Sequence, residues 1–242
     1  MYKYLLEELN VKLSSVCLGM MAMVSASVYA ADVEVKVQNL THGTYFAPLV
    51  VAAHKDTAKL FTVGMPASMS LAKLAEGGKI ADVAADFKAA GAMVVENPAN
   101  GLLESGKSTT FMLTTDDTNK YISLAAMLVP SNDGFVSANM IPIPTTKGEY
   151  VYMLNAYDAG TEANDEKRGS GEVGNAGFPV PAALDAKVGT GGTGISGVTA
   201  EGFVHIHRGM LGDDNPTGGK SDINIMTQRW LNPVARLVIT VK

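Results

Sequence analysis

Apolar and polar residues alternate along much of the chain after residue 31, as expected for strands with one buried and one exposed face. Valines at positions 33, 35 and 37 alternate with Glu34 and Lys36, and residues 234–241 follow the same rule. Residues 121–129 are almost wholly apolar, which indicates a strand covered on both faces. The predicted strands are residues 33–38, 45–53, 61–63, 92–96, 107–114, 121–129, 139–143, 149–157, 202–208 and 235–241.

Residues 68–92 differ from the rest because alanine, leucine, lysine and acidic residues dominate them. Apolar residues recur there at helical spacing behind a possible cap at Ser70. Glycines at 77 and 78 divide the segment, and residues 81–90 form a second amphipathic pattern. The sequence therefore predicts a pair of short helices laid against a β body.

Many short strands with a turn about every ten residues predict a mainly β fold, an antiparallel two-sheet β-sandwich with a short helical excursion. Residues 166–201 contain nine glycines and no periodic apolar pattern, so we expect a long irregular insertion there. Residues 31–242 are expected to form one domain.

Composition excludes several classes of protein. Of the 242 residues, 47% are apolar and 18% are charged, which is typical of a globular chain. The net charge is −5 and no cluster of lysine and arginine is present, which argues against nucleic-acid binding. No motif for a catalytic nucleophile, a metalloprotease, a phosphate loop or a dinucleotide fold occurs, so we expect no enzyme.

Residues 1–30 are typical of a secretory signal peptide. An apolar stretch at 16–24 precedes small residues that end at Ala30, where cleavage is expected, and it is too short for a stable membrane span. An uncleaved N-terminal anchor is the alternative. The one cysteine, Cys17, lies in this segment, so the mature chain has no disulfide, thiol nucleophile or cysteine-based zinc site. A secreted or periplasmic location without a transmembrane segment is predicted.

The loop at residues 155–165 is rich in side-chain oxygen atoms. It carries Asp158, Glu162, Asn164 and Asp165, with Gly160 allowing a tight reversal. Ca²⁺ prefers six to eight oxygen ligands, including carboxylates and carbonyls, so such a loop at a strand end is a candidate calcium site. A solvated acidic surface loop remains the alternative, since the spacing does not match the EF-hand pattern.

Four stretches of the sequence carry a family resemblance. They are Asn39-Leu40-Thr41 with Phe46-Ala47-Pro48, Ser131-Asn132-Asp133-Gly134-Phe135, Tyr157-Asp158-Ala159-Gly160-Thr161-Glu162, and Arg229-Trp230-Leu231-Asn232-Pro233-Val234-Ala235-Arg236. Together they resemble the spondin N-terminal domain family over about residues 31–241. The resemblance implies a C2-like antiparallel β-sandwich with a calcium site in the loops at one end. It also implies a binding or adhesion module that contacts extracellular matrix, a cell-surface component or an envelope component.

The resemblance places Asp158 and Glu162 on the family's acidic motif and Asp133 in its Ser-x-Asp turn. Glu162 stands where an aspartate is often found. Two acidic turns at one end of a sandwich repel each other unless a cation binds between them, and binding would tie the loops together. The predicted calcium ligands are Asp133, Asp158, Glu162, Asn164 and Asp165. An ordinary acidic rim, with Asp158 bonded to the backbone of its own turn, remains open.

His205 and His207 are two residues apart, so on a strand both project from the same face. They are a weaker candidate for a Zn²⁺ or Cu²⁺ pair, completed by a third ligand from His42, His54 or Asp213. The competing interpretation places both histidines on the exposed face of the strand. The alternatives to a calcium-binding module are thus a transition-metal envelope protein or metal-dependent enzyme, and a structural envelope protein without a ligand.

Overall fold

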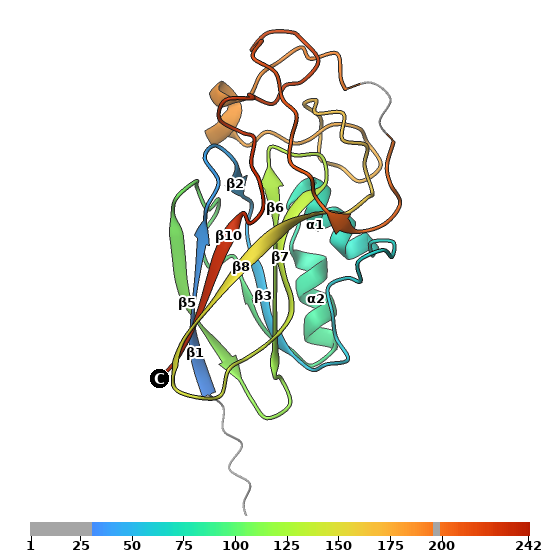
Figure 1. The fold of residues 1–242 in the computed structure, drawn as a ribbon. Helices are drawn as coiled ribbons and strands as arrows, with labels where there is room; N and C mark the ends of the chain where they lie inside the picture. Colours follow the sequence, from blue (N-terminus) through green and yellow to red (C-terminus); the bar gives the residue numbers. More distant parts are fainter. Residues whose placement is uncertain (1–30, 196–198) are drawn as a thin grey trace, which may run out of the picture.

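The computed structural model describes residues 31–195 and 199–242, so the predicted signal peptide, residues 1–30, lies outside the described residues. The described residues form a curled antiparallel sheet with two helices against one side and irregular loops over one end (Figure 1). The strands are β1 (Ala31–Asn39), β2 (Tyr45–Phe46), β3 (Val50–His54), β4 (Met93–Glu96), β5 (Ser108–Thr115), β6 (Tyr121–Val129), β7 (Gly134–Pro142), β8 (Gly148–Asp158), β9 (His205–Ile206) and β10 (Ala235–Val241).

The sheet nearly closes on itself. Its strand order is β4-β3-β6-β7-β8-β10-β1-β5, with β2 beside β6 and β9 beside β8. The two ends of this order meet because β5 contacts both β3 and β4. The predicted antiparallel β-sandwich is confirmed in this form, with both layers drawn from one continuous sheet that encloses a single main core.

Burial follows the predicted alternation. Val33, Val35 and Val37 on β1 are at most 1% exposed and belong to the main core. Strand β6 is buried on both faces, as its apolar sequence predicts. Leu124 points into the main core, whereas Ala125 belongs to a second apolar cluster that includes residues of the two helices.

The predicted helical excursion is confirmed as α1 (Met69–Gly77) and α2 (Ala81–Ala89). The helix cap is Ser68, whose hydroxyl accepts a hydrogen bond from the Leu71 amide at 3.2 Å. The expectation of Ser70 was wrong, because Ser70 already lies inside the first turn of α1. Gly78 ends α1 in the left-handed region at φ 66°, as a C-terminal glycine commonly does.

Several predicted strands differ from the observed ones. The strand predicted at residues 139–143 begins earlier, at Gly134, as β7. Residues 45–53 divide into β2 and β3, with Pro48 in the interruption between them. Residues 61–63 form no strand. Phe61 is buried by packing against other aromatic rings and not by strand pairing. Its ring packs in the second cluster against Phe135 and Tyr157, with ring centroids 5.4 and 4.8 Å away.

The strand predicted at residues 202–208 shortens to β9, which pairs with the end of β8. Just before it, Val204 exchanges hydrogen bonds with a neighbouring loop: its carbonyl accepts from the Gly64 amide at 2.8 Å and its amide donates to Met65 at 2.9 Å. This pairing with the sheet is short, but it sets His205 directly opposite Asp158.

Residues 166–201 are irregular where described, as predicted, apart from the short 3₁₀ helix η1 (Ala182–Lys187). The segment is nonetheless fastened to the body. Phe178 and Leu184 are fully buried in the main core, and the Arg168 backbone amide donates to Asp222 Oδ2, outside the segment, at 2.9 Å. In Figure 1 these loops lie over the upper end of the sheet.

Asp116, which is not among the predicted site residues, organises the turn between β5 and β6 through hydrogen bonds. Its carboxylate accepts hydrogen bonds from the Thr118 hydroxyl at 2.6 Å and the Asn119 amide at 2.8 Å. These bonds lower the pKa of Asp116 from 3.8 to about 2. A carboxyl whose pKa is depressed on folding stabilises the protein above its ordinary pKa, and this stabilisation is lost as the pH falls towards the folded value.

We expect Asp116→Ala to lower the free energy of unfolding by about 1 kcal/mol at neutral pH, the value for a hydrogen-bonded carboxylate near solvent. The difference from the unsubstituted protein should shrink as the pH falls from 3.8 to about 2. Urea unfolding at several pH values measures it. The exposed neighbour Asp117 provides the control, Asp117→Ala. A deficit of equal size at neutral and acid pH would contradict the assignment.

Candidate metal centre

The two predicted acidic turns meet at one end of the sheet. Asp133 directly precedes β7, and Asp158 is the last residue of β8. Because Gly134 pairs with Asp158 across these neighbouring strands, the turn at 131–134 lies beside the loop that follows Asp158. The convergence of the turns, expected from the sequence, is therefore present.

Asp133 is fully buried and joins the two turns. Its Oδ2 accepts hydrogen bonds from the amides of Thr161 at 2.8 Å and Glu162 at 3.1 Å. Its Oδ1 is buried with no hydrogen-bond partner in the described part of the chain. Burial raises the pKa of Asp133 well above its usual range, and the nearby charge of Asp158 raises it further.

Glu162, like Asp133, has one carboxylate oxygen that accepts hydrogen bonds and one without a partner in the described structure. Its Oε1 accepts hydrogen bonds from the Asn132 side-chain amide at 2.8 Å and from the Gly177 backbone amide. Its Oε2 is buried without a partner among the residues described. Burial raises the pKa of Glu162 to about 7. Asn132 also donates to Asp165 Oδ1 at 2.9 Å, so one amide group holds two acidic side chains.

Asp158 lies at the centre of the site, 1% exposed. Its Oδ1 accepts from the Gly160 amide at 2.8 Å, and its Oδ2 accepts from the Asn164 side-chain amide at 2.7 Å. Asn164 Oδ1 is buried and unpartnered within residues 31–195 and 199–242. Gly160 has φ 67°, and a Cβ there would lie 2.4 Å from the Phe203 carbonyl oxygen, so only glycine fits this turn.

Among the described residues, only the two histidines near Asp158 could balance this group of carboxylates. Within the described residues, no lysine or arginine lies within ion-pair distance of Asp133, Asp158 or Glu162. Buried carboxylates normally require a paired charge or a metal. The site therefore gathers buried carboxyl groups without a lysine or arginine partner in the described structure, which agrees with the raised pKa values of Asp133 and Glu162.

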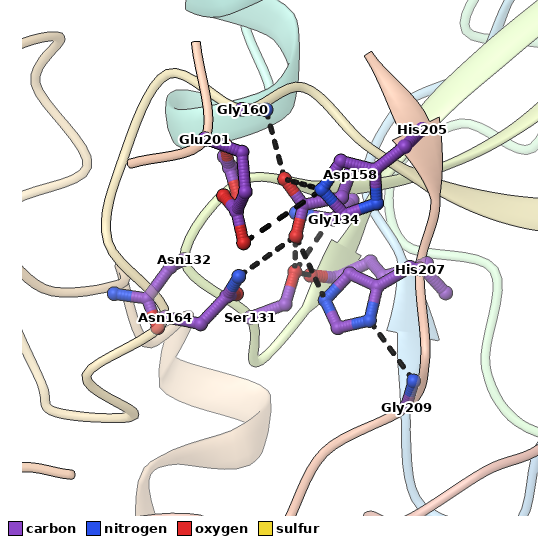
Figure 2. Close-up of polar contacts among 12 residues, drawn as sticks. Ser131, Asn132, Gly134, Asp158, Gly160, Asn164, Glu201, His205, His207 and Gly209 are labelled. Carbon is purple, nitrogen blue, oxygen red and sulfur yellow. Dashed lines mark hydrogen bonds and ion pairs between the residues drawn. The ribbon is translucent and has the colours of Figure 1, made fainter. Parts of the chain in front are cut away.

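The two histidines approach the same carboxylate. Figure 2 shows Asp158 between Glu201 and Asn164 on one side and His205 and His207 on the other. His205 Nε2 lies 3.7 Å from Asp158 Oδ1, and His207 Nε2 lies 3.8 Å from Asp158 Oδ2. The expectation from their spacing, that both project from one face, agrees with this arrangement. The competing interpretation, that both lie on the exposed face, is wrong, because His207 is only 4% exposed.

The other ligands considered for the histidine pair are used elsewhere. His54 is buried on β3, where its ring bonds to the Ser123 hydroxyl at 2.8 Å. Asp213 accepts amides of its own turn, those of Lys220 at 2.7 Å and Ser221 at 2.9 Å. His42 is exposed in the turn after β1.

Glu201 was missed by sequence reasoning. Of the His, Cys, Asp and Glu residues described, the set whose ligand atoms all lie within 4.8 Å of one another is Asp158, Glu201 and His205. Asp133, Asp158 and Glu162 stand farther apart than this. Glu201 belongs to an irregular segment without periodicity, so no pattern in the sequence pointed to it.

Asn132 is the residue whose removal tests this hydrogen-bond network. Asn132→Ala removes the donors to Glu162 and Asp165 and leaves the buried Glu166 amide, now 3.0 Å from Asn132 Oδ1, without its acceptor. We expect the free energy of unfolding to fall by about 2–4 kcal/mol in urea titrations. The exposed Asn175→Ala is the control, and an equal effect of both substitutions would refute the role of Asn132.

Comparison with known proteins identifies the family of the chain. The chain matches none of the curated proteins with which it was compared. The family model described as Spondin_N matches residues 37–166, more than half of the chain. The matched range includes all five predicted calcium ligands and ends before Glu201 and His205. The chain therefore belongs to the spondin N-terminal domain family.

Proposed function

We propose that this protein is an exported, non-enzymatic binding or adhesion module that holds a calcium ion among the buried carboxylates at one end of its sheet. Membership of the spondin N-terminal domain family indicates an extracellular binding module in general. The bound ion, the route of export and the class of partner go beyond that general indication.

The observation that carries the calcium proposal is a set of buried oxygen atoms without partners. Asp133 Oδ1, Glu162 Oε2 and Asn164 Oδ1 have no hydrogen-bond donor in the described part of the structure. Buried polar atoms are rarely left unpaired in folded proteins, and a bound ion is one of the ordinary explanations. All three belong to the two turns that meet at Asp158.

The donor chemistry fits a hard cation. Calcium takes carboxylate and amide oxygens, tolerates irregular geometry, and accepts ligands from several loops. The backbone amides that bind Asp133 Oδ2 fix that side chain and leave its other oxygen free. Because Asp133, Asp158 and Glu162 do not form a compact set like that of Asp158, Glu201 and His205, calcium binding would draw the loops together.

Such an ion would order the surface around it. Glu162 bonds to the Gly177 amide, so a ligand at Glu162 is mechanically linked to the glycine-rich segment 166–201. We propose that this segment and the calcium-bearing loops form the contact surface. The expected partners are extracellular matrix, a cell-surface component or an envelope component.

Export rests on the sequence of residues 1–30, which is typical of a signal peptide cleaved near Ala30. A secreted or periplasmic location follows from it. No helix among residues 31–195 and 199–242 is long and apolar enough to cross a membrane.

Calcium should raise the melting temperature of the mature protein. With a dissociation constant on the order of 10⁻⁴–10⁻³ M, as in extracellular modules, a tenfold excess over that constant adds about 1.4 kcal/mol. For a domain of this size the melting temperature rises by about 3–5 °C. Differential scanning calorimetry with calcium, and with magnesium at the same concentration, measures the shift.

Asp133→Asn and Glu162→Gln should each abolish the calcium-dependent shift, since each removes one charge while keeping the shape of the side chain. The exposed Asp214→Asn should retain it. A folded protein with no shift would favour a structural envelope protein without a ligand. A shift that survives both substitutions would show that calcium binds elsewhere and would contradict this site.

A further inference from the structure

We propose that Asp158, Glu201 and His205 form a second cation site, selective for a transition metal of the zinc class. Their ligand atoms lie within 4.8 Å of one another. His205 Nε2 is 3.7 Å from both Asp158 Oδ1 and Glu201 Oε1. The site is independent of the calcium proposal except that both use the side chain of Asp158.

The hydrogen bonding of His205 presents its Nε2 as a ligand. Its Nδ1 lies 3.0 Å from the Ile206 carbonyl oxygen, which can only accept, so Nδ1 carries the proton in the neutral ring. The lone pair is then on Nε2, which is buried and has no hydrogen-bond partner among the described residues. A ligating histidine whose other nitrogen donates to a backbone carbonyl is the usual arrangement in metal sites.

The distances fit an ion better than hydrogen bonds. A separation of 3.7 Å is too long for a hydrogen bond between Nε2 and either carboxylate oxygen. Ligands bound to zinc at about 2.0–2.2 Å in a tetrahedron stand roughly 3.3–3.6 Å apart. The two separations from His205 Nε2 are close to this range, and the third, between Asp158 and Glu201, is within 4.8 Å, so the three atoms reach a coordination shell by contracting around an ion. The imidazole nitrogen favours zinc or a neighbouring transition metal over calcium, which takes oxygen ligands.

His207 is a positioning residue: it faces Asp158 from the Oδ2 side and is not itself a ligand. It is 4% exposed, and its Nε2 has no partner in the described structure although it faces Asp158 Oδ2 at 3.8 Å. Its Nδ1 accepts the Gly209 amide at 3.0 Å, so the neutral ring carries its proton on Nε2. In this tautomer His207 directs a donor at Asp158 and has no lone pair for the metal.

The loop that supplies two of the three ligands is anchored. The Gly202 amide donates to the Gly160 carbonyl at 2.8 Å, directly after Glu201. The Val204 amide donates to Met65 at 2.9 Å, directly before His205. Glu201 and His205 are thus held next to the turn of Asp158 by backbone hydrogen bonds on both sides, which reduces the entropy lost when an ion binds.

The site opens into a pocket of about 250 Å³ lined by all three ligands, His207 and Arg208. Zinc with three protein ligands characteristically keeps a fourth position for water. The side chains of Glu201 and His205 are 34% and 20% exposed, so the ion can enter from solvent. The structure therefore points to a three-ligand centre with water in the open position.

Isothermal titration of the metal-free mature protein with zinc chloride, in the presence of saturating calcium, tests the site. We expect one zinc ion per chain. Glu201→Gln and His205→Ala should each weaken binding by more than tenfold, at least the loss usual for outer-shell changes. His42→Ala removes an exposed histidine elsewhere and should leave zinc affinity unchanged. Circular dichroism of each variant verifies folding, and the part-exposed Glu201 makes Glu201→Gln the safer variant.

Cobalt in place of zinc adds a spectroscopic measurement that would not change if Glu201 only stabilised the fold. The unsubstituted protein should give the visible absorption of four-coordinate cobalt, and folded Glu201→Gln should lose it. Zinc affinity that is unchanged in both Glu201→Gln and His205→Ala, or reduced equally by His42→Ala, would overturn the proposal. Neither variant removes Asp133 or Glu162, so the calcium-dependent melting shift stands or falls separately.

Discussion

The end of the molecule that carries the candidate sites depends on one buried carboxylate, that of Asp133. Ionised carboxylates are costly to bury, and here two backbone amides from the loop after β8 offset part of that cost. The same two hydrogen bonds fasten that loop to the turn before β7. The pairing of Gly134 with Asp158 sets the distance at which this can occur. Without Asp133 the loop amides of Thr161 and Glu162 would need other acceptors.

Glu162, close to Asp133, is also buried with only one of its two carboxylate oxygens hydrogen-bonded in the described structure. Asp133 accepts amides of the loop after β8 with one oxygen, and Glu162 accepts the Asn132 side chain and the Gly177 amide with one oxygen. The other oxygen of each has no partner among the described residues. Loop conformation and cation affinity are therefore properties of the same atoms. A cation added there would relieve the repulsion between the carboxylates. The hydrogen bond from the Gly177 amide to Glu162 explains how a glycine-rich segment without periodic apolar residues is fastened to the site.

The regular elements could be predicted from the sequence because their signal is local. The alternation at 33–37 and the apolar run of β6 each identify a strand, since neighbouring residues alone show the period and the buried positions. Failures came where burial was not due to strand pairing. Phe61 is apolar because it packs against the rings of Phe135 and Tyr157, and a local pattern cannot separate that cause from a strand.

The candidate site could be predicted only in part. Asp133 and Asp158 follow predicted strands, so their meeting followed from the sheet once the family resemblance was recognised. Glu201 reaches the site from the end of a long irregular segment, where neither period nor motif applies. The distinct tasks of His205 and His207 depend on which backbone groups bond to their Nδ1 atoms, the Ile206 carbonyl and the Gly209 amide. Their spacing in the sequence does not distinguish the two rings, whereas their different hydrogen bonds do.

Asp158 connects the two proposed cation sites, and this connection has a thermodynamic consequence. Its Oδ1 faces His205 and Glu201, while its Oδ2 faces Asn164 and His207. An ion on one side withdraws negative charge from the carboxylate and fixes its rotation for an ion on the other. Two bound cations close together also repel each other. The net coupling is the balance of orientation and repulsion, and linkage makes it reciprocal: zinc changes calcium affinity by the same factor as calcium changes zinc affinity. A single buried side chain would thereby make the occupancy of the proposed zinc pocket and that of the proposed calcium site depend on each other.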